Sequence, residues 1–135
     1  MVPDMKTAIL IIAHAPLASA YCEAASHILN GQHEQLICLD IKADADVEQS
    51  VKAGIGMLKQ LADEQGALVL TDCFGATPSN IARRVADSNP HNQLVTGINL
   101  PMLIRVLNYQ QEKAAALAGI AVDGGKTAII KPQAD

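Results

Sequence analysis

An apolar run that ends in a histidine constrains the fold of this chain more than any other stretch. Residues 7–13 read Thr-Ala-Ile-Leu-Ile-Ile-Ala, His14 follows at once, and Pro16 interrupts the backbone soon after. A short apolar run bounded by a breaker is typical of a central strand in a parallel sheet. Because α/β folds bind ligands beyond the carboxyl ends of their strands, His14 is a candidate functional residue.

Apolar runs alternate with segments of helical periodicity along the whole chain. Strands are predicted over residues 7–13, 35–39, 67–72, 93–97 and 127–130. Helices are predicted over residues 17–28, 44–66, 77–87, 99–107 and 111–122. This alternation favours an α/β fold, a parallel sheet with helices on both faces. We therefore expect a doubly wound three-layer sandwich with strand order 2-1-3-4. Residues 1–135 should form a single domain, in which residues 1–5 are a disordered lead.

The composition of the chain excludes several classes of protein. The net charge is −4 and the basic residues are scattered, apart from Arg83-Arg84, so no nucleic acid is expected as a partner. No run approaches the roughly 18 apolar residues of a membrane span, and the N-terminus lacks a secretion signal. Cys22, Cys38 and Cys73 are odd in number and lack zinc-type spacing, which predicts reduced thiols in a cytoplasmic protein.

The third predicted strand ends in Asp72, which is expected to meet His14. In the order 2-1-3-4 the first and third strands are neighbours, and their carboxyl ends meet at the switch point of the sheet. A carboxylate beside an imidazole accepts one ring N–H, leaves the other nitrogen with its lone pair, and stabilises positive charge on the ring. A lone histidine at the end of a strand is more often structural, but the matching aspartate favours a nucleophile or general base.

The loop after Asp72 has the features of an anion site. Gly75 lets the backbone approach a ligand closely, and Thr77-Pro78 predicts a helix start with Thr77 as N-cap. Helix N-termini hold phosphate through unpaired N–H groups and the helix dipole, and the Thr77 hydroxyl adds a donor. A histidine nucleophile, an orienting acid and an anion site together predict phosphoryl transfer through a phosphohistidine. Arg83-Arg84 is either a solvated helix face or a docking point for an acidic or phosphorylated partner.

The same residues belong to stretches that resemble a known family. The stretches are Ile9-Leu-Ile-Ile-Ala-His14, Thr71-Asp-Cys-Phe-Gly-Ala-Thr-Pro-Ser-Asn80 and Thr96-Gly-Ile-Asn-Leu-Pro-Met-Leu103. In these stretches and in the spacing between them, the chain resembles a mannose-family enzyme IIA of the bacterial phosphoenolpyruvate-dependent sugar phosphotransferase system. The likeness extends from about residue 6 to residue 131.

The resemblance implies a role for each of these residues. His14 would receive a phosphoryl group from the phosphocarrier protein HPr and pass it to an enzyme IIB, for sugar uptake or regulation. Asp72 would be the supporting acid and Thr77 the hydroxyl contact to the phosphate, with no metal or organic cofactor. The resemblance also implies a homodimer in which the last strand (127–130) pairs antiparallel at the sheet edge. Peripheral association with a membrane permease is compatible with this role.

The chain departs from the family pattern at three positions near the predicted site. Ala15 and Ala76 stand where the family commonly has glycine, and Thr77 stands where serine is usual. The hydrogen-bond donors are preserved by these changes, so we expect any effect to fall on the rate of transfer or on the choice of partner.

Three other functions are alternatives to this one, and they differ in the residues that they require after the first strand. The phosphocarrier subunit of a dihydroxyacetone kinase resembles the same family and uses the same strand-end histidine. A non-catalytic regulatory module, such as a response-regulator receiver, needs acids after the first strand to hold magnesium, and His14-Ala15-Pro16 offers none. A flavodoxin-like cofactor binder needs a hydroxyl- or glycine-rich phosphate loop at this point, which residues 14–19 match poorly.

Overall fold

A four-stranded parallel sheet forms the centre of the computed structural model, which describes residues 6–31, 33, 35–62 and 64–133. The strands are β1 (Ile9–His14), β2 (Leu36–Ile41), β3 (Leu68–Thr71) and β4 (Gln93–Val95). Their order is β2-β1-β3-β4, and every neighbouring pair is parallel. The strand order predicted from the sequence is thereby confirmed. The predicted lead over residues 1–5 lies outside the described residues.

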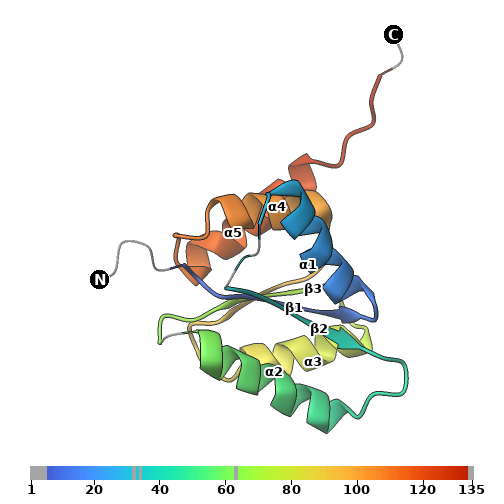
Figure 1. Ribbon diagram of the computed structural model, residues 1–135, viewed down its shortest axis with the longest axis vertical. Helices are drawn as coiled ribbons and strands as arrows, with labels where there is room; N and C mark the ends of the chain where they lie inside the picture. The colour runs from blue at the N-terminus through green and yellow to red at the C-terminus, as the bar shows by residue number, and fades with distance from the viewer. Residues whose placement is uncertain (1–5, 32, 34, 63, 134–135) are drawn as a thin grey trace.

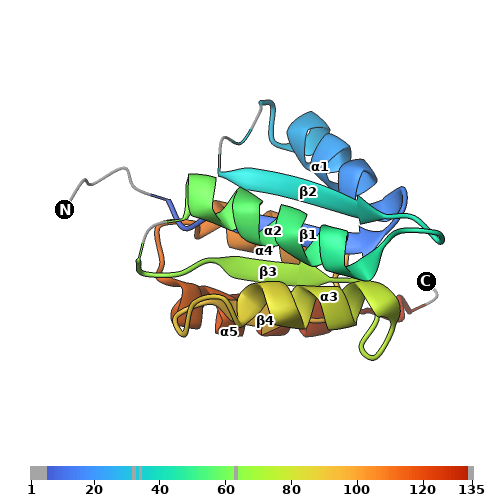
Figure 2. The same ribbon diagram turned by 90° about the horizontal axis from the view of Figure 1, so that it is seen from below.

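Helices cover both faces of this sheet. They are α1 (Leu17–Ile28), α2 (Val47–Leu61), α3 (Thr77–Ala86), α4 (Leu100–Asn108) and α5 (Ala114–Thr127). Figures 1 and 2 show α1, α4 and α5 on one face and α2 and α3 on the other, which is the predicted three-layer sandwich. None of the helices in the described ranges combines the length and the apolar content needed to cross a bilayer.

Strand β1 lies inside the sheet, because its apolar side chains pack against helices on both faces. Ile9, Ile11 and Ala13 belong to the core under α1, α4 and α5, whereas Leu10 and Ile12 belong to the core under α2 and α3. All of these side chains are at most 1% exposed. Since side chains of a strand alternate between faces, His14 follows Ile12 on the side of α2 and α3. His14 itself is exposed, so the burial of β1 ends at this residue.

The C-terminal part of the chain differs from the prediction. The sequence predicts a helix that ends at residue 122, just before Asp123-Gly-Gly, and an edge strand over 127–130, but α5 continues through Thr127 and residues 128–133 form no strand. The glycines lie inside the helix because they pack on α4. A Cβ on Gly124 would lie 3.0 Å from the Cβ of Arg105, and one on Gly125 would lie 2.9 Å from the terminal methyl of Met102.

Two of the three cysteines form a disulfide, which corrects the expectation of reduced thiols. Cys22 of α1 is bonded to Cys38 of β2, with 6.7 Å between their Cα atoms. Cys73 remains free and exposed. The sequence shows only that Cys22 and Cys38 are 16 residues apart. Their pairing depends on the position of α1 over β2, which cysteine spacing does not reveal.

Candidate active site

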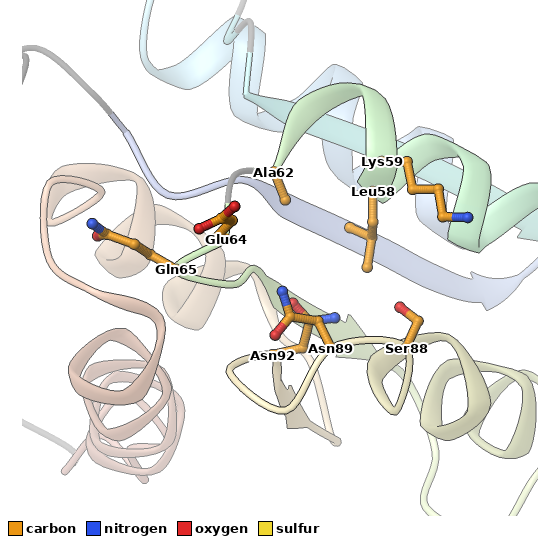
Figure 3. Close-up of a pocket in the computed structure, with 8 residues that line it drawn as sticks. All are labelled: Leu58, Lys59, Ala62, Glu64, Gln65, Ser88, Asn89 and Asn92. Carbon is orange, nitrogen blue, oxygen red and sulfur yellow. The ribbon is translucent and has the colours of Figure 1, made fainter.

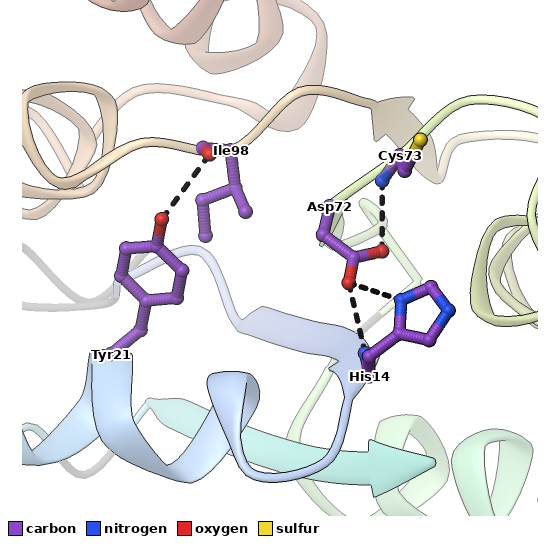
Figure 4. Close-up of polar contacts among 5 residues, drawn as sticks. All are labelled: His14, Tyr21, Asp72, Cys73 and Ile98. Carbon is purple, nitrogen blue, oxygen red and sulfur yellow. Dashed lines mark hydrogen bonds and ion pairs between the residues drawn. The ribbon is translucent and has the colours of Figure 1, made fainter. Parts of the chain in front are cut away.

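His14 and Asp72 form a hydrogen-bonded pair at the carboxyl edge of the sheet (Figure 4). The Nδ1 atom of His14 lies 2.7 Å from Oδ2 of Asp72, and the backbone N–H of His14 donates to the same oxygen at 2.9 Å. The two residues are 58 positions apart, and the parallel pairing of β1 with β3 brings them together. The predicted contact is therefore present.

The electrostatics of the pair favour an ionised aspartate. Burial raises the pKa of the Asp72 carboxyl, but hydrogen bonds from the His14 N–H, the His14 ring and the Cys73 N–H outweigh burial. The charge of His14 lowers the pKa further, and the result lies below the ordinary value of 3.8. Asp72 is therefore a carboxylate near neutral pH, with a side chain that is only 12% exposed.

An ionised Asp72 determines which nitrogen of His14 is free to react. A carboxylate only accepts hydrogen bonds, so we assign the proton of the neutral ring to Nδ1. The lone pair then lies on Nε2, which Figure 4 shows on the side of the ring away from Asp72. The His14 side chain is 53% exposed, so a reactant can approach Nε2 from solvent. This arrangement suits attack on an external electrophile.

A second layer of hydrogen bonds holds the end of β3, and the sequence prediction did not include it. The N–H groups of Gly97 and Ile98 donate to the carbonyls of Asp72 and Thr71, at 3.0 and 3.1 Å. The Tyr21 hydroxyl donates to the Ile98 carbonyl at 3.3 Å (Figure 4). Burial, and then the charge of Asp72, raises the pKa of Tyr21 above 10.0, so Tyr21 stays a neutral donor.

Tyr21 was missed because its spacing fits the apolar face of α1. The only sequence signal for another role is its hydroxyl, which a core position seldom leaves without a partner. Gly97 and Ile98 belong to the third stretch that resembles the family, residues 96–103. Their backbone contacts show that this stretch supports the carboxyl end of β3 and supplies no reactive side chain at that point.

The start of α3 lies at the same sheet edge as His14. The predicted cap is off by one residue: Ala76, with extended backbone (φ −79°, ψ 168°), is the N-cap, so Thr77 is the first helical residue and Pro78 the second. Gly75 has a φ of 87°, a left-handed conformation that favours glycine. Gly75 and Thr77 are both exposed. Their backbone and the Thr77 hydroxyl are therefore accessible to an anion bound at the helix start.

The two adjacent arginines of α3 have different surroundings. Arg84 donates to both carboxylate oxygens of Glu48 on α2, at 2.7 and 2.9 Å. Arg83 forms no ion pair within the described part of the chain, and it lines a hollow of about 480 Å³ with Phe74 and Thr96. Arg84 therefore links two helices, and only Arg83 is available to a partner.

A larger hollow, of about 620 Å³, lies away from these residues (Figure 3). Its lining includes Leu58 and Lys59 from the end of α2 and Asn92 from the loop before β4. Asn92 accepts from the N–H of Ala67 and donates to the carbonyl of Ala86, so its amide connects the ends of β3 and α3. No residue of the predicted site lines this hollow, and the role of Asn92 there is structural.

Comparison with known proteins identifies the family of the chain. The family model described as "PTS system fructose IIA component" (EIIA-man) matches residues 8–121. The mannose-specific EIIAB component of the phosphotransferase system from Escherichia coli K12 is 27% identical over 127 residues, which cover 93% of this chain and 39% of that protein. The fructose-specific EIIA component from Bacillus subtilis is 26% identical over 106 residues, which cover 78% of this chain and 72% of that protein.

The solved structures include a similar fold. The mannose/sorbose specific IIA subunit from Enterococcus faecalis superposes with a TM-score of 0.86 at 23% identity, and the match covers 97% of this chain and 98% of that one. Since the family model matches most of the chain, the chain belongs to the EIIA-man family of IIA components of the sugar phosphotransferase system. The resemblance drawn from the sequence is confirmed. The chain spans only about two fifths of the length of the Escherichia coli relative.

Proposed function

We propose that the chain is a phosphoryl carrier that accepts phosphate from phospho-HPr on Nε2 of His14 and passes it to an enzyme IIB. The observation that carries this proposal is the 2.7 Å contact between Nδ1 of His14 and the carboxylate of Asp72. That contact orients the ring and leaves Nε2 as the nucleophile. Membership of the EIIA-man family supports the choice of a phosphoryl group as the electrophile.

The transfer step follows from these positions. The lone pair of Nε2 attacks the phosphorus, and the bond from phosphorus to the donor's ring nitrogen breaks, returning its electron pair to the donor. The His14 ring keeps its Nδ1 proton, and Asp72 stabilises the positive charge that develops on the ring. The first N–H groups of α3, the backbone of Gly75 and the hydroxyl of Thr77 are suited to the phosphoryl oxygens. Transfer to IIB is the reverse sequence with another acceptor.

The proposal is tested by labelling the wild-type chain. Incubation with radiolabelled phosphoenolpyruvate, enzyme I and HPr should give about one phosphate per chain, and omission of HPr should remove the label. The label should be lost in acid and kept in alkali, since a phosphoramidate bond hydrolyses at low pH. A label that survives acid, as a phosphoserine would, would contradict a phosphohistidine.

The proposed role also implies where in the cell the protein works. The phosphoryl group originates from phosphoenolpyruvate, a metabolite of the cell interior, so we place the working protein in the cytoplasm. An acceptor IIB that is bound to a membrane permease would bring the chain to the membrane peripherally.

We further propose a homodimer that uses the segment after α5. Ile129 and Ile130 are 78% and 71% exposed, and apolar side chains exposed side by side in this way favour contact with another chain. Strand β4 is an edge of the sheet, so it presents unpaired backbone groups to such a partner.

The double variant Ile129→Ser, Ile130→Ser is expected to be monomeric at concentrations where the wild-type chain is a dimer. The substitutions remove the exposed apolar pair without touching the core. Sedimentation equilibrium measures the effect, and Val122→Ser, which alters a 39% exposed residue on α5, is the matched control that should remain dimeric. A wild-type monomer, or a dimer of the double variant with unchanged affinity, would exclude this interface.

A further inference from the structure

The only phenylalanine of the chain stands in solvent beside the candidate nucleophile. Phe74 is 76% exposed, although the core has ample aliphatic surface against which an aromatic ring could pack. Single exposed apolar residues are common and need no explanation by themselves. The position of Phe74 is what distinguishes it, because the residue lies in the loop between Asp72 and Gly75.

Exposed apolar side chains stand on both loops that meet at the His14–Asp72 pair. Phe74 follows Asp72 by two residues, so their Cα atoms are at most about 7 Å apart. Leu17, which is 43% exposed, follows His14 by three residues and begins α1. The nucleophile is therefore flanked by apolar groups on the β1 side and on the β3 side.

The hollow next to Phe74 adds an unpaired cation. Phe74 and Arg83 both line this hollow, of about 480 Å³, between α3 and β4. Arg83 has no ion pair in the described ranges, in contrast to Arg84. Asp87 lines the same hollow, so a partner that covers this surface would meet the apolar ring of Phe74 beside charges of both signs.

We infer that Phe74 is the docking anchor for the phosphodonor protein, and this inference rests on the proposed function. A donor must bring its phosphohistidine to Nε2 of His14, so its surface must cover the loops around that atom. An interface of about 800 Å² per partner has a radius of about 16 Å. Phe74 lies well inside this radius, in the zone where aromatic side chains contribute most to binding.

The test separates docking from chemistry by using two donors. Transfer from phospho-HPr to Phe74→Ala should show a KM raised about 10- to 30-fold, as for truncation of an interface hot spot, with kcat changed less than twofold. Labelling of the same variant by phosphoramidate, a small donor that needs no docking surface, should change less than twofold. Phe74→Tyr keeps the ring and should restore the wild-type KM.

Tyr109→Ala is the matched control for loss of an exposed aromatic ring. Tyr109 is 45% exposed and follows α4, next to Gln110, whose carbonyl accepts from Thr7 just before β1. It therefore lies at the edge of the sheet opposite His14, and its variant should transfer phosphate from HPr like the wild-type chain.

Three results would overturn the inference. An unchanged KM for phospho-HPr would show that Phe74 does not bind the donor. Equal slowing with HPr and phosphoramidate would show that Phe74 only supports the active-site loop. A changed sedimentation mass would make Phe74 a contact between copies of the chain. If the wild-type chain accepts no phosphate from phospho-HPr, the proposed function itself fails, whatever the behaviour of the variant.

Discussion

The variant His14→Ala is expected to take up no phosphate in an assay with phosphoenolpyruvate, enzyme I and HPr. Nε2 of His14 is the proposed nucleophile, and alanine has no atom that can form the bond to phosphorus. The fold should persist because the His14 side chain is 53% exposed and is not part of either core. The measurement is the number of acid-labile phosphates per chain, together with a circular dichroism spectrum to verify the fold.

His91→Ala is the matched control for removal of a histidine. His91 is exposed in the loop before β4, and its hydrogen bond to the Asn89 side chain uses the backbone N–H, which the substitution keeps. This variant should be labelled like the wild-type chain. Undiminished labelling of His14→Ala would move the phosphoryl group to another residue and would end the proposal for His14.

The central strands and the predicted catalytic pair could be derived from the sequence because their signals are local. The run that ends in His14 is buried on both sides of the sheet, and the run before Asp72 is as well, so each strand is visible as an unbroken apolar segment. Once the strand order is known, parallel pairing brings the two strand ends together. The contact between His14 and Asp72 then follows without further information.

Features that depend on packing between distant segments could not be derived in this way. Gly124 and Gly125 are typical of a turn, yet they lie within α5 because α4 leaves no room for larger side chains. The Cys22–Cys38 bond depends on how α1 lies over β2. The helix start at Thr77 was misplaced by only one residue, because the extended backbone of Ala76 has no side-chain signature.

The residues that hold Asp72 in place could not be derived from the sequence either. Tyr21 reaches the Ile98 carbonyl, and the Gly97–Ile98 backbone in turn binds the end of β3. Each of these residues has an ordinary local explanation in the sequence, as a helix face or as a loop. Their joint role at Asp72 exists only in three dimensions. A prediction from one sequence therefore finds reactive groups more readily than the residues that position them.

The variant Asp72→Asn is expected to fold and to accept phosphate from phospho-HPr about 10²- to 10³-fold more slowly than the wild-type chain. Asparagine keeps an oxygen that can accept from the His14 N–H, but it loses the charge that stabilises the phosphorylated ring. Its amide can also donate to Nδ1, which would move the ring proton to Nε2 and block the nucleophile. Rapid-quench kinetics measure the rate, and Asp123→Asn on the exposed side of α5 is the matched control. An unaltered rate would make Asp72 a structural residue.

The low pKa of Asp72 predicts a second signature, in stability rather than in rate. The folded-state pKa lies below 3.8, so the ionised carboxylate stabilises the fold above that pH, and this contribution is lost as the pH falls through the folded-state value. The excess in free energy of unfolding of the wild-type chain over the Asp72→Asn variant should therefore shrink as the pH falls below 3.8. Urea unfolding over a pH series measures it. An excess that is independent of pH would mean that the hydrogen bonds from His14 and Cys73 do not require a charged acceptor.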